Sequence, residues 1–280
     1  MSRNLTLAAI QFTPSDNVQD NIDRVADYIR DAAGKGADVV LPPELFCGHY
    51  FCKTQDEVHF ARAQPWRDHP AVIQLAPLAA ELGVVIPVSI YEKEGPHYFN
   101  SLVMLDADGT PLGVYRKSHI PDGPGYQEKF YFRPGDTGFR VWETLKGTIG
   151  VGICWDQWFP EAARIMALMG ADVLLYPTAI GAEPQDASLD TAARWRRAMQ
   201  GHAVSNTIPV VAANRVGDED GQIFYGTSFI TDHTGEILAD LDRKTQGVVM
   251  ATVDLDLVDR DRAAWGFFRD RRTDLYGGLL

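Results

Sequence analysis

Short runs of apolar, largely β-branched residues recur along the whole chain. Most of these runs are apolar at every position rather than at alternate positions, which is typical of strands covered on both faces of a sheet. Layers of this kind need helices or a second sheet on each side, so the pattern favours an α/β fold. The expected strands lie at residues 5–11, 38–42, 84–91, 148–153, 172–176, 209–213 and 248–254.

Helical patterns separate several of these strands. Apolar residues repeat every three or four positions from Ile22 to Ala33, with Asp20 or Asn21 as the candidate N-cap. Two other stretches read as hairpins, since apolar segments flank the turn sequences DADGT and DHTGE. The sheets should therefore be mixed. The other helices are expected at about 70–82, 160–169 and 189–205, and the hairpins at 99–117 and 222–242.

One segment in the first half of the chain is similar in sequence to a segment in the second half. Residues 36–44 read GADVVLPPE and residues 170–178 read GADVLLYPT, which agree at six of nine positions, and each follows a predicted helix. The echo indicates two related halves, although chance similarity between two buried strands is the alternative. The chain has no low-complexity stretch and no linker rich in Pro, Gly or Ser. We therefore expect a single domain over residues 1–280, built as a sandwich of two sheets with helices outside.

The composition of the chain argues against some classes of partner and location. The 280 residues carry 26 Lys and Arg against 38 Asp and Glu, a net charge of −12, so a nucleic-acid partner is not expected. No stretch approaches the roughly 18 apolar residues of a membrane span. The three cysteines, Cys47, Cys52 and Cys154, could form at most one disulfide and would leave one thiol over. The simpler interpretation of this cysteine count is a reducing compartment, and the cytoplasm is the expected location.

Cys154 lies where an apolar run breaks and a helix is expected a few residues later, in IGVGICWDQWFPEAAR. A thiol at such a turn meets backbone N–H groups and the positive end of a helix dipole, both of which favour the thiolate. Gly150 and Gly152 permit close approach of the backbone. The alternative is a buried cysteine that acts only as a small apolar residue. The context favours a nucleophile.

A thiol nucleophile needs a base, and none of the seven histidines lies in a recognisable cysteine-protease context. Carboxylates and ammonium groups at strand ends are the other way to move protons. Glu44 ends the strand DVVLPPE, and Lys117 ends the strand GVYRK. Each alone could simply mark where the chain reaches water. If the strands belong to one sandwich, however, these two residues and Cys154 could converge on one rim.

In these motifs the chain resembles the nitrilase superfamily of carbon–nitrogen hydrolases. That family has a Glu-Lys-Cys triad in three separated motifs, which match LPPELF around Glu44, YRKSHIP around Lys117 and GVGICWDQWFPEAAR around Cys154. A fourth motif, GYQEKFYFRPGDTGF, places Glu128 where the family has a second glutamate. The resemblance covers essentially the whole chain. It implies a four-layer α-β-β-α sandwich of two mixed sheets.

Longer stretches, such as KSHIPDGPGYQEKFYF and the segment 176–203, are similar to members of the family that act on N-carbamoylputrescine. The reaction so implied is hydrolysis of this ureide to putrescine, carbon dioxide and ammonia. Cys154 would attack, while Glu44 would move the protons. Lys117 and the backbone N–H of Trp155 would hold the oxyanion, and Glu128 would orient Lys117. Neither a metal nor another cofactor is implied.

The implied substrate is a small cationic ureide, whose ammonium should prefer an acidic or aromatic lining. Candidates are Glu183 and Asp186 in the loop GAEPQDAS, followed by Asp156, Asp122 and Tyr50. One rival is a related hydrolase acting on another ureido acid or an ω-amide, for which a carboxylate substrate would require an arginine in the pocket. The other is a non-catalytic binding or redox-sensing protein.

Two further segments have alternative interpretations. Cys47, His49, Cys52 and His59 offer four nitrogen and sulfur ligands, but the spacing C-x-H-x2-C-x6-H fits none of the common zinc patterns. A pocket wall is the preferred interpretation. The tail 255–280 interleaves acidic and basic residues with aromatic ones and could be a solvated helix face. By resemblance it is instead an arm that contacts another subunit, in a homodimer or larger homo-oligomer.

Overall fold

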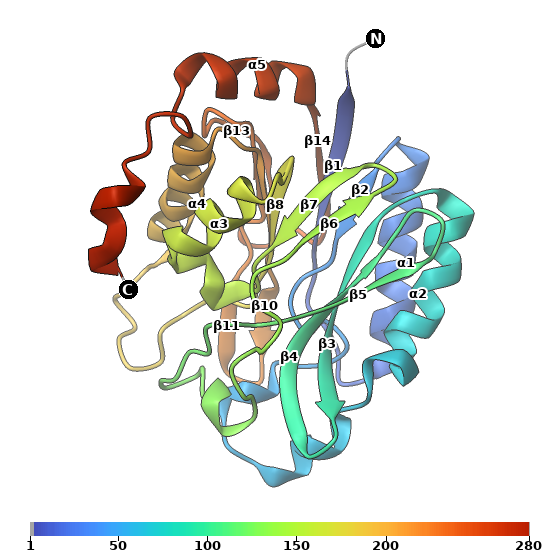
Figure 1. The fold of residues 1–280 in the computed structure, drawn as a ribbon. Coiled ribbons are helices and arrows are strands. Elements are labelled where there is room, and N and C mark those ends of the chain that lie inside the picture. Colours follow the sequence, from blue (N-terminus) through green and yellow to red (C-terminus); the bar gives the residue numbers. More distant parts are fainter. Residues whose placement is uncertain (1–2, 280) are drawn as a thin grey trace.

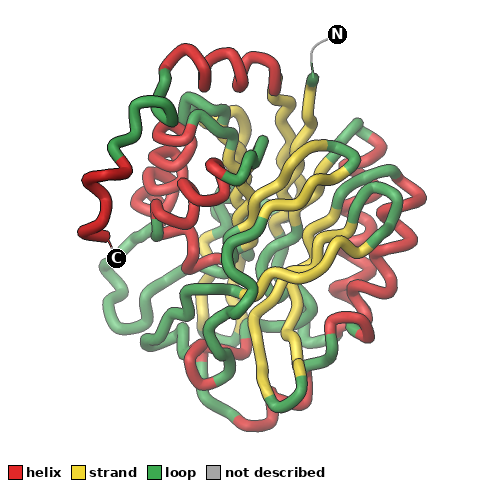
Figure 2. The backbone as a smooth tube through the Cα atoms, viewed as in Figure 1, coloured by secondary structure: helices red, strands yellow, loops and turns green. Residues whose placement is uncertain are grey.

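The structure is a computed structural model that describes residues 3–279. Within these residues, strands form the middle of the molecule and most helices lie on either side of them (Figures 1 and 2). The longer helices are α1 (Val18–Gly34), α2 (Pro70–Leu82), α3 (Pro160–Leu168), α4 (Ala192–Asn206) and α5 (Leu255–Trp265). The 3-10 helices are η1 (Phe51–Lys53), η2 (Glu57–Arg62), η3 (Trp66–Asp68), η4 (Glu128–Phe130), η5 (Cys154–Trp158) and η6 (Thr273–Leu279).

The first group of strands has the order β14-β1-β2 and β3-β4-β5. Strands β1 and β2 are parallel, whereas β14 and the β3-β4-β5 meander are antiparallel to their neighbours. A parallel bridge between Val39 and Val85 connects β2 to the start of β3, so the two sheets are continuous. The bounds are β1 (Asn4–Gln11), β2 (Val39–Leu41), β3 (Ile86–Glu94), β4 (His97–Leu105), β5 (Pro111–Arg116) and β14 (Gly247–Asp254).

The second sheet has the order β13-β12-β9-β8-β7-β6. Its middle strands β7, β8 and β9 are parallel, and antiparallel strands flank them on both sides. A separate hairpin is formed by β10 and β11. The bounds are β6 (Val141–Thr144), β7 (Gly147–Val151), β8 (Val173–Pro177), β9 (Val210–Ala213), β10 (Val216–Glu219), β11 (Gln222–Tyr225), β12 (Phe229–Thr231) and β13 (Ile237–Asp240).

The echoed segments occupy matching places in the two groups. Residues 36–44 lead from α1 into β2, and residues 170–178 lead from α3 into β8. Each of these strands is the middle one of three strands that run parallel. The similarity in sequence therefore coincides with a similarity in topology.

Burial explains why the strands are apolar at every position. Leu7 on β1 packs in one apolar cluster with Leu41, Val151 and Leu175, which belong to both groups of strands. The next residue, Ala8, lies in another cluster with side chains of α1 and α2. Successive residues of a strand point to opposite faces, and both faces are covered. A third cluster joins α3 and α4 to the outer face of β8 and β9.

The predicted mixed α/β fold is confirmed, but one hairpin differs from the prediction. Residues 222–225 pair with β10, and only the segment from β12 onward pairs with β13. Gly226 and Thr227 have φ angles of 60° and 61°, and this left-handed bend divides the expected first strand. Along residues 3–279, no helix combines the length and apolar character needed to cross a bilayer.

Gly135 provides a test of how the end of β5 is held. Its N–H donates to the carbonyl of Lys117 at 2.8 Å, and an added Cβ would lie 2.0 Å from the carbonyl oxygen of Arg116. Because backbone has to move to relieve this overlap, Gly135→Ala should lower the free energy of unfolding by about 1–3 kcal/mol. Chemical denaturation measures the loss. In the control, Gly34→Ala, the new Cβ enters open space at the end of α1. An equal midpoint for both variants would contradict the prediction.

Candidate active site

The structure brings Glu44, Lys117, Glu128 and Cys154 to one buried place. Glu44 follows β2, Lys117 follows β5, and Glu128 and Cys154 begin the helices η4 and η5. The exposed fraction is 0% for Glu44, 1% for Lys117 and Glu128, and 5% for Cys154. Groups from both layers of strands therefore meet in a region that excludes water.

Lys117 lies between two carboxylates. Its Nζ is 2.9 Å from Glu44 Oε1 and 2.7 Å from Glu128 Oε2. Burial alone would lower the pKa of Lys117, but Glu128 and Glu44 together raise that pKa well above its ordinary value. The ammonium is therefore permanently charged. Each carboxylate has a further donor, since Asn100 Nδ2 lies 2.7 Å from Glu44 Oε1 and the Tyr50 hydroxyl lies 2.7 Å from Glu128 Oε1.

Cys154 occupies a sharp turn between β7 and η5. Its φ angle is 40°, in the left-handed region that is unusual for a residue with a side chain. The Asp156 carboxylate holds the turn by accepting from the N–H of Ile153 at 2.9 Å and the Tyr115 hydroxyl at 2.7 Å. The amide of Trp155 belongs to the first turn of η5, where N–H groups have no acceptor within the helix. The turn thus offers a donor next to the thiol.

The electrostatics correct one expectation about this thiol. Burial, with the nearby Glu44 carboxylate next in importance, raises the pKa of Cys154 well above its ordinary value, although Lys117 opposes the rise. The turn geometry is expected to favour the thiolate, whereas burial favours the neutral thiol. Its Sγ lies 3.8 Å from the carbonyl oxygen of Ala179.

A cavity of about 400 Å³ opens over Cys154 and Glu128. Two of the predicted substrate-binding residues, Asp122 and Glu183, line it. A third, Tyr50, is fully buried and reaches the site through its hydrogen bond to Glu128. The remaining lining includes both aromatic and charged side chains, namely Tyr126, Trp155, Trp158 and Arg194.

Two predicted substrate-binding residues lie elsewhere. Asp156 is fully buried beneath the Cys154 turn, where it also accepts from the ring Nδ1 of His119 at 2.7 Å. Asp186 is exposed in its loop and accepts from the N–H and hydroxyl of Ser188, at 3.0 and 2.6 Å. Neither lines the cavity. Their carboxylates hydrogen-bond to nearby groups and lie away from the cavity wall, which does not favour a direct contact with substrate.

Sequence reasoning missed two buried residues of the site, Asn100 and Arg215. The Arg215 guanidinium donates to the carbonyl of Glu44 at 3.0 and 3.1 Å and to that of Gly48 at 3.0 Å, and it pairs with Glu219 at 2.7 Å. It thus fixes the backbone that carries Glu44. Arg215 comes just after the apolar strand at 209–213, so the strand-end rule used for Glu44 could have found it.

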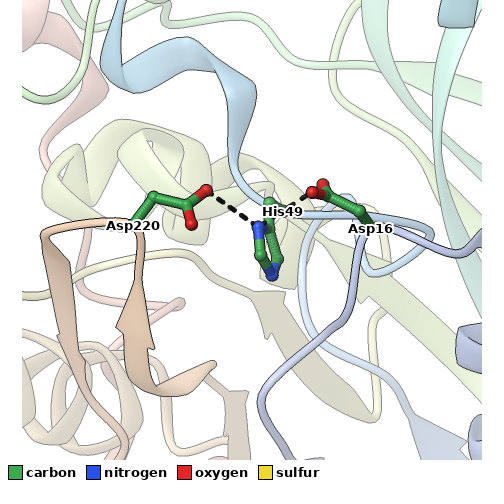
Figure 3. A group of neighbouring side chains, drawn as sticks. All are labelled: Asp16, His49 and Asp220. Carbon is green, nitrogen blue, oxygen red and sulfur yellow. Dashed lines mark hydrogen bonds and ion pairs between the residues drawn. The ribbon is translucent and has the colours of Figure 1, made fainter.

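The four residues considered as zinc ligands are not assembled as such. Among residues 3–279, the His, Cys, Asp and Glu side chains close enough to share an ion are Asp16, His49 and Asp220. Figure 3 shows His49 between the two carboxylates, with Nδ1 at 3.4 Å from Asp16 and 3.0 Å from Asp220. Both aspartates are mostly exposed, and Lys53 also pairs with Asp220 at 3.0 Å. Surface ion pairing explains this group.

Comparison with known proteins identifies the family. Residues 6–263 match the carbon-nitrogen hydrolase family. The chain belongs to this family. It is 54% identical to an N-carbamoylputrescine amidase of Arabidopsis thaliana, over 99% of this chain and 96% of that protein. It is also 48% identical to a citrullinase of Francisella tularensis, over 99% and 98% of the two chains.

A solved structure agrees with this assignment. The crystal structure of a carbon-nitrogen hydrolase from Helicobacter pylori superposes with a TM-score of 0.92 at 37% identity, covering 99% of this chain and 98% of that one. The family resemblance seen in the sequence motifs is therefore confirmed across nearly the whole chain. The positions of the two family members' elements agree closely enough that the site can be interpreted on a shared fold.

The protonation state of Cys154 can be tested directly. Because burial raises the pKa of Cys154, we expect no thiolate at about pH 7 and little at about pH 8.5, where an ordinary thiol is half ionised. The difference in ultraviolet thiolate absorbance between the wild type and Cys154→Ala isolates this group. Burial also raises the pKa of Cys47 to about 12, so its background is small. A thiolate that titrates near neutral pH would contradict the prediction.

Proposed function

We propose that this protein hydrolyses N-carbamoylputrescine to putrescine, carbon dioxide and ammonia. The observation that carries the proposal is the 54% identity to the Arabidopsis amidase over 99% of the chain. The groups present suit the reaction, because the Cys154 thiol and the Glu128 carboxylate line one cavity, and the buried Lys117 ammonium bridges Glu128 and Glu44 beside it. The catalytic residues we assign are Cys154, Glu44, Lys117 and Glu128.

In the first step the proton of Cys154 passes to Glu44 while the sulfur attacks the ureido carbon. The S–H bond breaks, its electron pair forms the S–C bond, and the carbonyl oxygen becomes an oxyanion. Lys117 and the amide of Trp155 are the donors for that oxyanion. Glu128 supports Lys117 from the other side at 2.7 Å.

Collapse of this intermediate expels a nitrogen of the urea, which takes the proton from Glu44. The carboxylate then removes a proton from water, and the resulting hydroxide attacks the acyl-enzyme and releases the thiol. The acyl group leaves as a carbamic acid that still carries the second urea nitrogen, and its breakdown to carbon dioxide releases that nitrogen, so that ammonia and putrescine are both formed. Each proton that Glu44 receives is thereby returned, and the residue ends as it began.

The ammonium at the far end of the substrate has an acidic and aromatic region available in the cavity. Within the described part of the chain, the Glu183 carboxylate accepts one side-chain hydrogen bond, from Gln185 at 3.1 Å, so it retains free acceptor capacity. Asp122 lines the same cavity, and Tyr126 and Trp158 supply aromatic surface. We assign Glu183 as the principal partner of the ammonium, with Asp122 and Tyr50 in supporting positions.

A second candidate function is suggested by one observation. Arg194 also lines the cavity and has no ion-pair partner among residues 3–279. A guanidinium in this place could bind a carboxylate, which N-carbamoylputrescine lacks. A ureido α-amino acid such as citrulline presents both a carboxylate and an ammonium, and a relative that is 48% identical is a citrullinase.

The proposal extends to assembly and location. We assign the chain to one α-β-β-α domain that forms a homodimer or larger homo-oligomer, with residues 255–280 as a contact arm; Leu280 lies outside the described residues. Apolar side chains are exposed on and just after α3, near the end of α4 and along the tail, which supports a covered surface. The exposed apolar residues are Ile165, Leu168, Met169, Val204, Trp265, Phe267 and Leu275.

We place the protein in the cytoplasm because its three cysteines are free.

Ammonia release from three ureides tests the reaction. With N-carbamoylputrescine, citrulline and N-carbamoyl-β-alanine at equal concentration, we expect the highest kcat/KM for N-carbamoylputrescine and none in Cys154→Ala. Circular dichroism of that variant verifies that it is folded. A preference for citrulline that Arg194→Ala abolishes would establish the second candidate instead. A preference for N-carbamoyl-β-alanine, or full activity without Cys154, would overturn the proposal.

Glu183 has a matched control in the same loop. Because Glu183→Gln removes the negative charge but keeps the shape, KM for N-carbamoylputrescine should rise about tenfold with a smaller change in kcat. Asp186→Asn, which removes an equal charge outside the cavity, should leave KM near the wild-type value. Steady-state kinetics of the two variants make the comparison. Equal KM values in both would remove Glu183 from the ammonium site.

A further inference from the structure

Asn100 is the polar side chain that the fold places beside both Glu44 and Lys117. It lies on β4 and is fully buried, and its carbonyl accepts from the N–H of Lys117 at 2.8 Å. This backbone bond sets Asn100 opposite Lys117 on neighbouring strands, where side chains of facing residues project from the same side of the sheet. Both side chains then reach the same oxygen, Glu44 Oε1, at 2.7 and 2.9 Å.

The two oxygens of Glu44 are consequently unequal. Oε1 accepts a charged donor from Lys117 and an amide donor from Asn100. Oε2 is buried and has no hydrogen-bond partner among residues 3–279. A buried carboxylate oxygen without a partner costs free energy, so its presence calls for an explanation. The oxygen that receives no hydrogen bond keeps its full electron density and is the more basic of the two.

We infer that Asn100 is a positioning residue that makes Oε2 of Glu44 the proton-accepting atom. The inference rests on the proposed function, in which Glu44 takes the proton of Cys154. In that step the S–H bond breaks and an O–H bond forms on Oε2, while the electron pair remains on sulfur. The two donors on Oε1 hold that oxygen in place, and they leave Oε2 as the atom of the carboxylate that is free to take the proton.

Other charged and titratable groups also surround Glu44 and have to be considered in any pH measurement. Their influence is common to the wild type and to an uncharged replacement of Asn100. The amide of Asn100 has no charge, so replacing it by leucine, which has a similar size and shape, removes one donor and leaves this set intact. The groups are Lys117, Glu128, Cys154, Tyr50, Cys52 and Arg215, whose guanidinium is bonded to the backbone carbonyl of Glu44.

The test follows alkylation of Cys154 by iodoacetamide, a reaction that needs the same proton transfer but no substrate. Mass spectrometry of the peptide that contains Cys154 separates it from Cys47 and Cys52. In Asn100→Leu the rate at the plateau of the pH profile should fall about tenfold, because the carboxylate loses one of the two donors that hold Oε1 and leave Oε2 free. The acid limb should move to higher pH, because a carboxylate with fewer donors is easier to protonate.

Asn206 supplies a matched control. It is also a buried asparagine with one unpartnered carbonyl oxygen, but it ends α4 and its Nδ2 bonds to the carbonyl of His202 at 2.9 Å. Asn206→Leu should therefore cost stability and leave the alkylation profile of Cys154 unchanged. Denaturation midpoints of both variants identify any loss that reflects unfolding alone, and Asn100→Asp, which adds a charge and loses the donor, should move the acid limb further than Asn100→Leu.

Several outcomes would overturn the inference. An acid limb in Asn100→Leu that coincides with that of Asn206→Leu would show that Asn100 does not act on the proton transfer. A shifted limb with an undiminished plateau would show that the hydrogen bond adjusts basicity without selecting an oxygen. Failure of the proposed function appears separately, as a wild type that alkylates at Cys154 normally but releases no ammonia from N-carbamoylputrescine.

Discussion

The buried contact of Lys117 with Glu44 and Glu128 is the constraint on which the rest of the site depends. Three charged groups are removed from water there, and each costs several kcal/mol to bury. Their mutual attraction offsets this cost only if the remaining hydrogen-bonding atoms are satisfied, which Asn100 and Tyr50 largely achieve. With both carboxylates ionised, the three groups carry one negative charge in excess. Burial above all, and the nearby carboxylates after it, raise the pKa values of the neighbouring Cys154 and Tyr50.

The fold satisfies this constraint by drawing on both layers of strands. Glu44 and Lys117 follow strands of the first layer, whereas Cys154 and Arg215 follow strands of the second. Arg215 then crosses between them, because its guanidinium is bonded to the carbonyl of Glu44. A relative shift of the two groups of strands would therefore change the position of Glu44 relative to Cys154. The apolar cluster shared by the layers opposes such a shift, since close-packed interiors deform little.

Much of this could be predicted from the sequence, and the reason is the regular pattern of buried strands. Continuous apolar runs predict the strands, and the residues at the ends of these strands include Glu44, Lys117 and Cys154. Asp156, two residues after Cys154, could not be placed in this way. A carboxylate at that position can face the cavity or cap the turn. Only the backbone conformation at Cys154 decides between the two. Asn100 lies inside a strand and not at its end. Its partner Glu44, 56 residues away, is not on a strand that pairs with β4, so tertiary packing that the strand pattern does not show brings the two together.

The excess charge also explains why a neutral thiol is compatible with nucleophilic catalysis. Ionising Cys154 into solvent would add a second uncompensated negative charge to a buried site, which is the physical meaning of its raised pKa. Transfer of the same proton to Glu44 leaves the total charge unchanged and moves it from oxygen to sulfur. A low dielectric strongly opposes the addition of a net charge to the site. It opposes the movement of an existing charge from Glu44 to Cys154 much less. In the mechanism that we propose, the thiolate therefore forms as the proton reaches Glu44, so that the nucleophile and the acid that protonates the leaving nitrogen arise in the same step.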